Sequence, residues 1–103
     1  MKKSVFICGP MSGLPHSNYP AFHAAAAELR AAGCVVANPA ENPAPLCGTW
    51  AAYMRLSIPQ MLACDSVLML PGWEKSEGAT LERQIARKLG MPVRYLPCPE
   101  VAK

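Results

Sequence analysis

Glu82 is the residue in this sequence that is best suited to chemistry. It ends the stretch "LPGWEKSEGATLE" (70–82), in which an apolar run stops at Leu70, a Pro-Gly turn follows, and a helix is expected to begin. At the edge of the apolar face of that helix, a carboxylate is partly buried and can act as a nucleophile or a base. The alternative is a solvated glutamate that pairs with Arg83 or Arg87 at the surface.

The residues just before Glu82 indicate how a ligand would be held. Ser76 and Gly78 mark the start of the helix, where a hydroxyl and free backbone N–H groups can bind an anion. Ser76 also suits a plain N-cap, and the two roles are compatible. Gly72 and Trp73 occupy the preceding turn, and the Trp73 indole is expected to stack on a base or to cover a pocket.

Two further loops carry small and polar residues of the same kind. Glycines in the loop "GPMSG" let backbone N–H groups approach a phosphate or sugar, or simply form a turn; its members are Gly9, Pro10, Met11, Ser12 and Gly13. The loop "NPAE" (38–41) supplies Asn38 and Glu41. Glu41 and Glu74 would join Glu82 at one rim, which would allow a mechanism with paired carboxylates.

The pattern of expected elements brings these loops to a common edge. Short apolar runs predict strands at 4–8, 34–37, 66–70 and 92–96. Helical spacing predicts three helices: one from Pro20 to Gly33, one capped by Thr49 and broken or kinked at Pro59, and one from Ser76 or Glu77 to Gly90 that buries Leu81, Ile85 and Leu89. Alternating strands and helices indicate a mostly parallel sheet, and ligands bind such sheets beyond the carboxyl ends of the strands.

The composition fits a single domain over 1–103 and disfavours several classes of function. Hydrophobic residues make up 51% of the 103 residues and charged residues 17%, which is enough apolar material for one core. A net charge of +3, spread along the chain, does not favour nucleic acid as a partner. The apolar runs are far below membrane-spanning length and no signal peptide is visible, so no membrane partner is expected.

Cysteine and histidine give no reason to expect a metal or a disulfide framework. Five cysteines, an odd number without C-x-x-C spacing, indicate a reduced, cytoplasmic protein. Neither His16 nor His23 has a metal-ligand partner at the usual spacing, so no metal site is predicted. The loops match neither the dinucleotide fingerprint nor the P-loop, so no cofactor is expected.

Taken in order, the motifs resemble a known family. "FICGPMSGLP", "NPAE" and "LPGWEKSEGATLE" look like the small DUF4406 proteins, which are often phage-associated and are related to nucleoside 2-deoxyribosyltransferases and nucleotide N-glycosidases. The likeness runs from about Val5 to Val93. It implies one nucleoside 2-deoxyribosyltransferase-like domain with a Rossmann-like (flavodoxin-like) α/β fold, a doubly wound sheet of about four to five mostly parallel strands with helices on both faces.

The resemblance also implies roles for individual residues. In the related enzymes a glutamate in the helix after the third strand attacks the anomeric carbon and forms a glycosyl-enzyme, and Glu82 matches it. Phosphate-using members carry a serine and a glycine that Ser76 and Gly78 match. Asp65 matches an aspartate before the third strand, although a turn or capping role fits it at least as well. Phe6 replaces the tyrosine of a Y-x-x-G motif, so that phenol is missing.

Three functions are compatible with these observations. The first is cleavage or transfer at the N-glycosidic bond of a nucleoside or nucleotide, with Glu82 as the nucleophile. The second, which Phe6 favours, is non-catalytic binding of a nucleotide or nucleotide sugar by a sensor or sequestering protein. The third is a phage-related interaction module that uses the loop 38–48. A homodimer or larger homo-oligomer is expected, because a small sheet protein gains core by association and related sites borrow residues from a neighbour.

Overall fold

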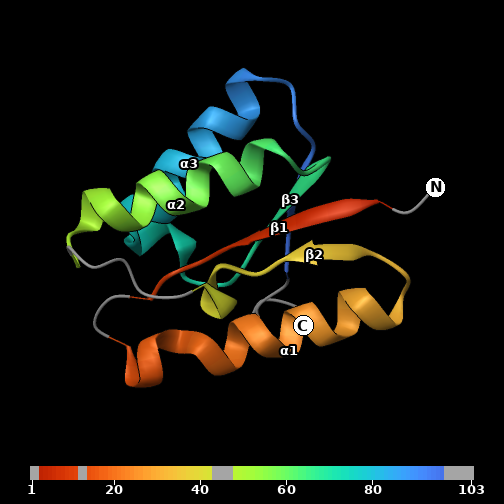
Figure 1. The fold of residues 1–103 in the computed structure, drawn as a ribbon, viewed down its shortest axis with the longest axis horizontal. Helices are drawn as coiled ribbons and strands as arrows, with labels where there is room; N and C mark the ends of the chain where they lie inside the picture. Colours follow the sequence, from red (N-terminus) through yellow and green to blue (C-terminus); the bar gives the residue numbers. More distant parts are fainter. Residues whose placement is uncertain (1–2, 12–13, 43–47, 97–103) are drawn as a thin grey trace.

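The chain folds around a four-stranded parallel sheet. The computed structural model describes residues 3–11, 14–42 and 48–96. Its strands are β1 (Ser4–Cys8), β2 (Val35–Ala37), β3 (Ser66–Met69) and β4 (Val93–Tyr95). They pair in parallel in the order β2-β1-β3-β4 (Figure 1). The Rossmann-like, doubly wound α/β arrangement expected from the sequence is therefore confirmed.

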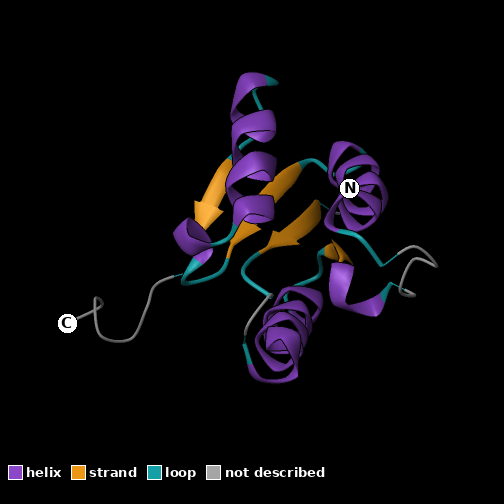
Figure 2. Ribbon diagram, turned by 90° about the vertical axis from the view of Figure 1, so that its left-hand side faces the viewer, coloured by secondary structure: helices purple, strands orange, loops and turns teal. Residues whose placement is uncertain are grey.

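Helices cover both faces of this sheet. One face carries α1 (Tyr19–Ala31), and the other carries α2 (Trp50–Leu62) and α3 (Glu77–Lys88) (Figure 1, Figure 2). Short 3-10 helices lie in the loops: η1 (Pro15–Asn18), η2 (Pro39–Glu41) and η3 (Trp73–Lys75). Among the helices of the described residues, none is long and apolar enough to cross a membrane.

The core has two layers because successive side chains of a strand point to opposite faces of the sheet. Ile7 points toward α1, in a layer completed by Phe22, Ala25, Ala26, Ala40 and Leu70. Phe6 and Cys8 point toward α2 and α3, in a layer completed by Met61, Val67, Met69, Ala79 and Ala86. Cys8, at the carboxyl end of β1, thus faces the space between the two helices.

Local sequence signals place the helix ends where they were expected. The Thr49 hydroxyl accepts a hydrogen bond from the backbone N–H of Ala52 at 3.2 Å and caps α2. The Ser76 hydroxyl accepts one from the N–H of Ala79 at 3.2 Å and caps α3. Gly33 follows α1 with φ +94°, a left-handed conformation that favours glycine after a helix.

The expected break at Pro59 is wrong. α2 runs through this proline as one helix from Trp50 to Leu62 (Figure 1). A proline inside a helix removes one backbone hydrogen bond and its ring crowds the carbonyl of the preceding turn. Met54 and Met61, on either side of it, are both buried, so both halves of the helix are held by packing.

The expected buried face of α3 is correct only in part, because Ile85 packs against the core but Leu89 does not. Its buried residues are Ala79, Glu82 and Ala86, whereas Leu89 is 62% exposed. α3 packs against both the sheet and α2, and small residues at the contact let the helices approach closely. The larger Leu81 and Ile85 are consequently only half-buried.

Candidate active site

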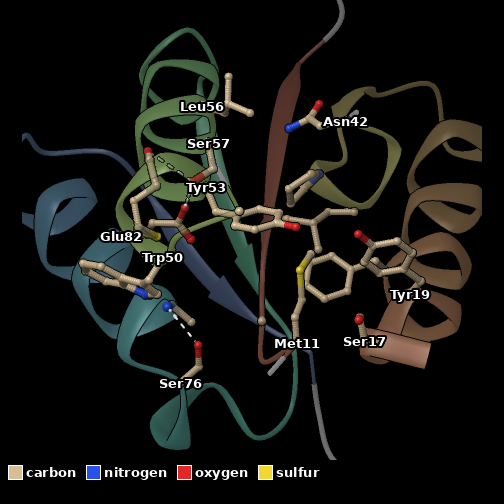
Figure 3. A pocket seen from close by; sticks show the side chains of 18 residues that line it. Met11, Ser17, Tyr19, Asn42, Trp50, Tyr53, Leu56, Ser57, Ser76 and Glu82 are labelled. Carbon is tan, nitrogen blue, oxygen red and sulfur yellow. Dashed lines mark hydrogen bonds between the residues drawn. The ribbon is translucent and has the colours of Figure 1, made fainter. Parts of the chain in front are cut away.

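A cavity of about 350 Å³ opens at the carboxyl end of β1. From β1 the chain goes to β2 on one side, and from β2 it crosses to β3 on the other side of β1, so this is the point where the winding reverses. Its walls come from the loop after β1, the start of α1, and the facing sides of α2 and α3 (Figure 3). The position and volume are typical of a small-molecule site, which occupies about 300–1,000 Å³ in most proteins.

Glu82 lies in the wall of this cavity that α3 provides. Its side chain is only 6% exposed, and the Ser57 hydroxyl on α2 donates a hydrogen bond of 2.6 Å to its Oε2 (Figure 3). Glu82 is therefore central in the buried face of α3 rather than at its edge. The alternative of a surface pair is excluded, because Arg83 instead donates from Nε to the Tyr95 hydroxyl at 2.7 Å.

Burial dominates the electrostatics of this carboxylate. It raises the pKa of Glu82 above the ordinary value of 4.5, while the hydrogen bond from Ser57 and an interaction with the Cys8 thiol lower that pKa in part. Burial and the charge of Glu82 together raise the pKa of Cys8 well above the usual range. Cys8 is thus a neutral thiol beside the carboxylate, not a thiolate nucleophile.

Ser76 and Gly78 line the same cavity as Glu82. The Ser76 hydroxyl already caps α3, so the N-cap role is present and its place in the cavity wall leaves a ligand role open. A Cβ on Gly78 would lie 3.0 Å from Sδ of Met54 and 3.4 Å from Nε1 of Trp50. The glycine is therefore where α2 and α3 come close at the cavity.

The loop after β1 supplies Gly9 and Met11 to the cavity lining. A Cβ on Gly9 would lie 2.8 Å from Cβ of Leu70, so the loop can pass β3 only with glycine at this position. Pro10 is buried, and its carbonyl accepts a hydrogen bond of 2.9 Å from Nδ2 of Asn18. The two remaining residues of the predicted loop, Ser12 and Gly13, lie outside the described residues.

The two polar residues of the "NPAE" loop, Asn38 and Glu41, have structural roles and are not part of the cavity wall. Asn38 is buried, accepts a 3.0 Å hydrogen bond from the N–H of Ala40, and lies 3.2 Å from Nδ1 of His23. Glu41 forms a two-pronged ion pair with Arg30 at 2.8 and 2.9 Å, which lowers the pKa of Glu41. Neither residue lines the cavity.

Trp73 and its neighbours lie beside β4 instead of over the cavity. The Arg83 guanidinium lies 4.8 Å from the centre of the Trp73 ring, and the Tyr95 ring is 5.8 Å from it. Gly72 forms the turn before Trp73 with φ +87°. Glu74 is exposed, and none of these residues lines the cavity.

Asp65 lies at the opposite, amino-terminal edge of the sheet. Its Oδ2 accepts hydrogen bonds from the backbone N–H of Ser4 at 3.0 Å and from the Ser4 hydroxyl at 3.1 Å. These bonds lower the pKa of Asp65. Asp65 therefore joins the starts of β1 and β3, in agreement with the turn or capping role and away from Glu82.

Ser57 is a site residue that sequence reasoning missed. Trp50, Tyr53, Met54 and Ser57 recur at the spacing of one helix face, and all four line the cavity. The sequence signal that could have identified this helix face as part of the site is Ser57, a serine in an otherwise apolar stripe. Phe6 points into the core layer under α2 and α3, fully buried, and does not line the cavity.

A family model described as "Domain of unknown function (DUF4406)" matches residues 3–95, so the chain belongs to this family. No curated protein and no solved structure shows a significant match.

Proposed function

We propose that this DUF4406 protein cleaves or transfers at the N-glycosidic bond of a nucleoside or nucleotide, with Glu82 as the nucleophile. The observation that carries the proposal is a buried carboxylate in the wall of a small-molecule cavity at the switch point of the sheet. Aromatic rings and hydroxyls that suit a base and a sugar surround it.

In this mechanism the ionised Glu82 attacks the anomeric carbon as the bond to the base breaks. The glycosyl ester that forms is then attacked by water or by a second base, which restores the carboxylate. The hydrogen bond from Ser57 keeps the carboxylate oriented during attack. Because burial raises the pKa of Glu82, activity is expected to rise with pH through that pKa.

The second candidate function is non-catalytic binding of a nucleoside or nucleotide. Among the described residues that line the cavity, Glu82 is the only carboxylate, so no paired acid stands ready to protonate a leaving base. Phe6 is also directed into the core, where it offers no hydroxyl. Both observations favour a protein that holds its ligand without breaking it.

Base release separates the two functions. Purified protein is incubated with deoxynucleosides and nucleoside monophosphates, and free base is measured by liquid chromatography. We expect release by the wild type, a loss of roughly a thousandfold or more in Glu82→Gln, and no change in Glu74→Gln, a matched exposed glutamate that does not line the cavity.

A glycosyl-enzyme would be seen directly. Intact mass after incubation with a 2-fluoro-sugar nucleoside should rise by the mass of the sugar, and peptide mapping should place it on Glu82. Full turnover by Glu82→Gln would remove this residue from the mechanism. Tight binding by the wild type with no product from any nucleoside would select the binding function instead.

We further propose that the protein acts in the cytoplasm as a homodimer or larger homo-oligomer. The support is an apolar stripe on α2, formed by Trp50, Tyr53 and Leu56, that stays 45%, 44% and 42% exposed at the cavity. Exposed apolar surface of this kind beside a cavity is typical of a contact surface.

A further inference from the structure

The described residues that line the cavity carry a single formal charge, and that charge is negative. Among its described lining residues, Glu82 is the only Asp, Glu, Lys, Arg or His. The positions outside the described residues nearest in sequence, 12–13 and 43–47, read Ser-Gly and Pro-Ala-Pro-Leu-Cys and include no basic residue. The lining that the structure describes therefore offers a phosphate no positively charged side chain, only the backbone N–H groups at the start of α3.

Within the part of the chain that the structure describes, the carboxylate has no counter-ion. Its polar neighbours, Ser57 and Cys8, are neutral donors. Arg30 pairs with Glu41, and Arg83 lies against Trp73 and Tyr95. The other basic residues of the two wall helices, Arg55, Arg87 and Lys88, are not among the described residues that line the cavity. A buried, unpaired anion is costly, and a ligand that brings a positive charge recovers part of that cost on binding.

Aromatic rings complete a surface that suits a cation. Trp50 lies beside Glu82, and the Tyr53 ring extends from α2 toward the α1 side of the cavity, where Tyr19 lies (Figure 3). Trp50 and Tyr53 are about half exposed, so their faces are accessible to a ligand. Faces of Trp and Tyr attract cations, and most strongly where water is displaced.

A positive charge on the ligand would also remove the need for an acid that protonates the departing base. A neutral nucleoside releases its base as an anion unless an acid protonates it, and no second carboxylic acid is found among the described lining residues. A heterocycle with a fixed positive charge on the glycosidic nitrogen needs no proton, because it leaves as a neutral molecule.

We propose that this site takes an N-glycoside whose heterocycle carries a fixed positive charge and whose sugar carries no phosphate, a pyridinium-type nucleoside. The proposal rests on the N-glycosidic function above. Glu82 forms a C–O bond to the anomeric carbon while the C–N bond breaks and its electron pair returns to the ring nitrogen. A cationic substrate and an anionic carboxylate thus give a neutral heterocycle and a neutral glycosyl ester. Water then attacks the anomeric carbon, releasing the sugar and one proton and restoring the carboxylate.

A matched set of probes tests this charge preference. Nicotinamide riboside is a pyridinium nucleoside, its dihydro form is neutral with the same sugar and nearly the same shape, and the mononucleotide adds a phosphate. Affinities are measured by titration calorimetry at pH 8, and nicotinamide release by chromatography. We expect the riboside to bind at least about tenfold more tightly than the dihydro form and the mononucleotide.

Variants test whether Glu82 is responsible for the preference for the positively charged riboside. In Glu82→Gln the ratio of the riboside and dihydro affinities should fall well below the wild-type ratio, whereas Glu74→Gln should keep the wild-type ratio. Trp50→Leu should weaken binding of the riboside more than that of the dihydro form, because it removes the ring that attracts the cation.

The possible failures are distinguishable. Equal or tighter binding of the dihydro form by the wild type would overturn the proposal, and this comparison requires no variant to fold. Base release from neutral deoxynucleosides but not from the riboside would overturn the cationic substrate while preserving the N-glycosidic function. Charge-selective binding with no release from any nucleoside would support the cationic ligand and overturn the role of Glu82 as nucleophile.

Discussion

Glu82 lies on a helix face whose other buried positions are alanines, Ala79 and Ala86. A carboxylate among such residues is disfavoured, because its charged form loses water and gains only neutral hydrogen-bond donors. Positions that break a local rule of folding in this way are often functional, since stability is sacrificed there for activity. The burial of Glu82 is thus both the argument for its role and the source of two predictions.

Replacing Glu82 by Gln should stabilise the protein at neutral pH. Since the folded-state pKa is raised, the folded protein binds this proton more tightly than the unfolded chain does. The contribution of Glu82 to the free energy of unfolding is therefore present in acid and is lost as pH rises from about 4.5 through the raised pKa. Thermal unfolding should show a melting temperature a few degrees higher for Glu82→Gln at pH 7, where about 1 kcal/mol corresponds to roughly 4–8 °C in a domain of this size.

The difference between the two proteins should shrink toward pH 4. A lower melting temperature for Glu82→Gln at pH 7 would mean that its hydrogen bonds, rather than its desolvation, dominate the stability of this position. Glu74→Gln serves as the control, because the side chain of Glu74 is exposed.

Ser57 should act as a positioning residue for Glu82. Its 2.6 Å hydrogen bond lowers the pKa of the carboxylate, so Ser57→Ala should raise that pKa further and move the acid limb of the pH–rate profile to higher pH. Activity below the new pKa should fall roughly tenfold to a hundredfold. Ser57→Thr keeps a hydroxyl and should restore the wild-type profile.

The titration of Glu82 can be followed without any substrate. Carboxyl ¹³C chemical shifts against pH, compared between the wild type and Ser57→Ala, give the direction of the change. An unchanged Glu82 titration in Ser57→Ala would show that the serine only fills space.

Among the elements, β1 and the loop after it set the geometry of the cavity. Gly9 passes so close to Leu70 that a Cβ would lie 2.8 Å from the Cβ of that residue. The contact involves the first atom of a fully buried side chain, which cannot move without moving β3 or the loop. The close approach therefore fixes the end of β1 relative to the start of the turn at Gly72.

Gly9→Ala should consequently destabilise the fold by about 1–3 kcal/mol. Urea unfolding would show this as a lower midpoint with an unchanged slope. The same change should weaken ligand binding, because Gly9 lines the cavity. A variant as stable as the wild type would mean that the loop relaxes away from Leu70 at little cost.

Elements with strong local signals were predictable from the sequence. The order of strands and helices, the caps at Thr49 and Ser76, and the glycine after α1 each depend on neighbours in sequence, and all were confirmed. The continuity of α2 through Pro59 and the buried face of α3 depend on packing between helices and sheet. Propensity and periodicity contain no information on that packing, so the break at Pro59 and the burial of Leu89 were both predicted wrongly.

The candidate site was predictable only in part, for the same reason. Glu82, Ser76, Gly78, Gly9 and Met11 were expected at one rim, and they do line one cavity. Ser57 reaches Glu82 from 25 positions away in the chain, and no motif joins the two. Glu41 and Trp73 have the right residue types in the right loops, but Arg30 and Arg83 hold them elsewhere.

At the scale of the whole molecule, the amino-terminal and carboxyl-terminal ends of the strands have different roles. The amino-terminal edge is held by the hydrogen bonds between Asp65 and Ser4, and the carboxyl edge carries the cavity. The cavity is bordered on its α2 side by the exposed apolar stripe of Trp50, Tyr53 and Leu56. One chain alone leaves this stripe facing solvent, which is why we expect association.

A homodimer should therefore be the main species at micromolar concentration. Light scattering after size exclusion should give at least twice the mass of one chain. Leu56→Asp, which places a charge in the stripe, should shift the protein toward the monomer, whereas Leu89→Asp, at an exposed leucine just after α3, should not. A wild-type protein that runs as a monomer at all concentrations would contradict the expectation.

The two tryptophans of the chain have very different surroundings. Trp50 is in the cavity wall, while Trp73 lies under the guanidinium of Arg83 beside β4. The protein therefore contains an optical reporter at the site and an internal reference away from it. An occupant that stacks on Trp50 should quench its emission, and Trp73→Phe should leave that quenching intact while Trp50→Phe abolishes it. Occupancy of the cavity can thus be read from intrinsic fluorescence, without a label and before any reaction has been found.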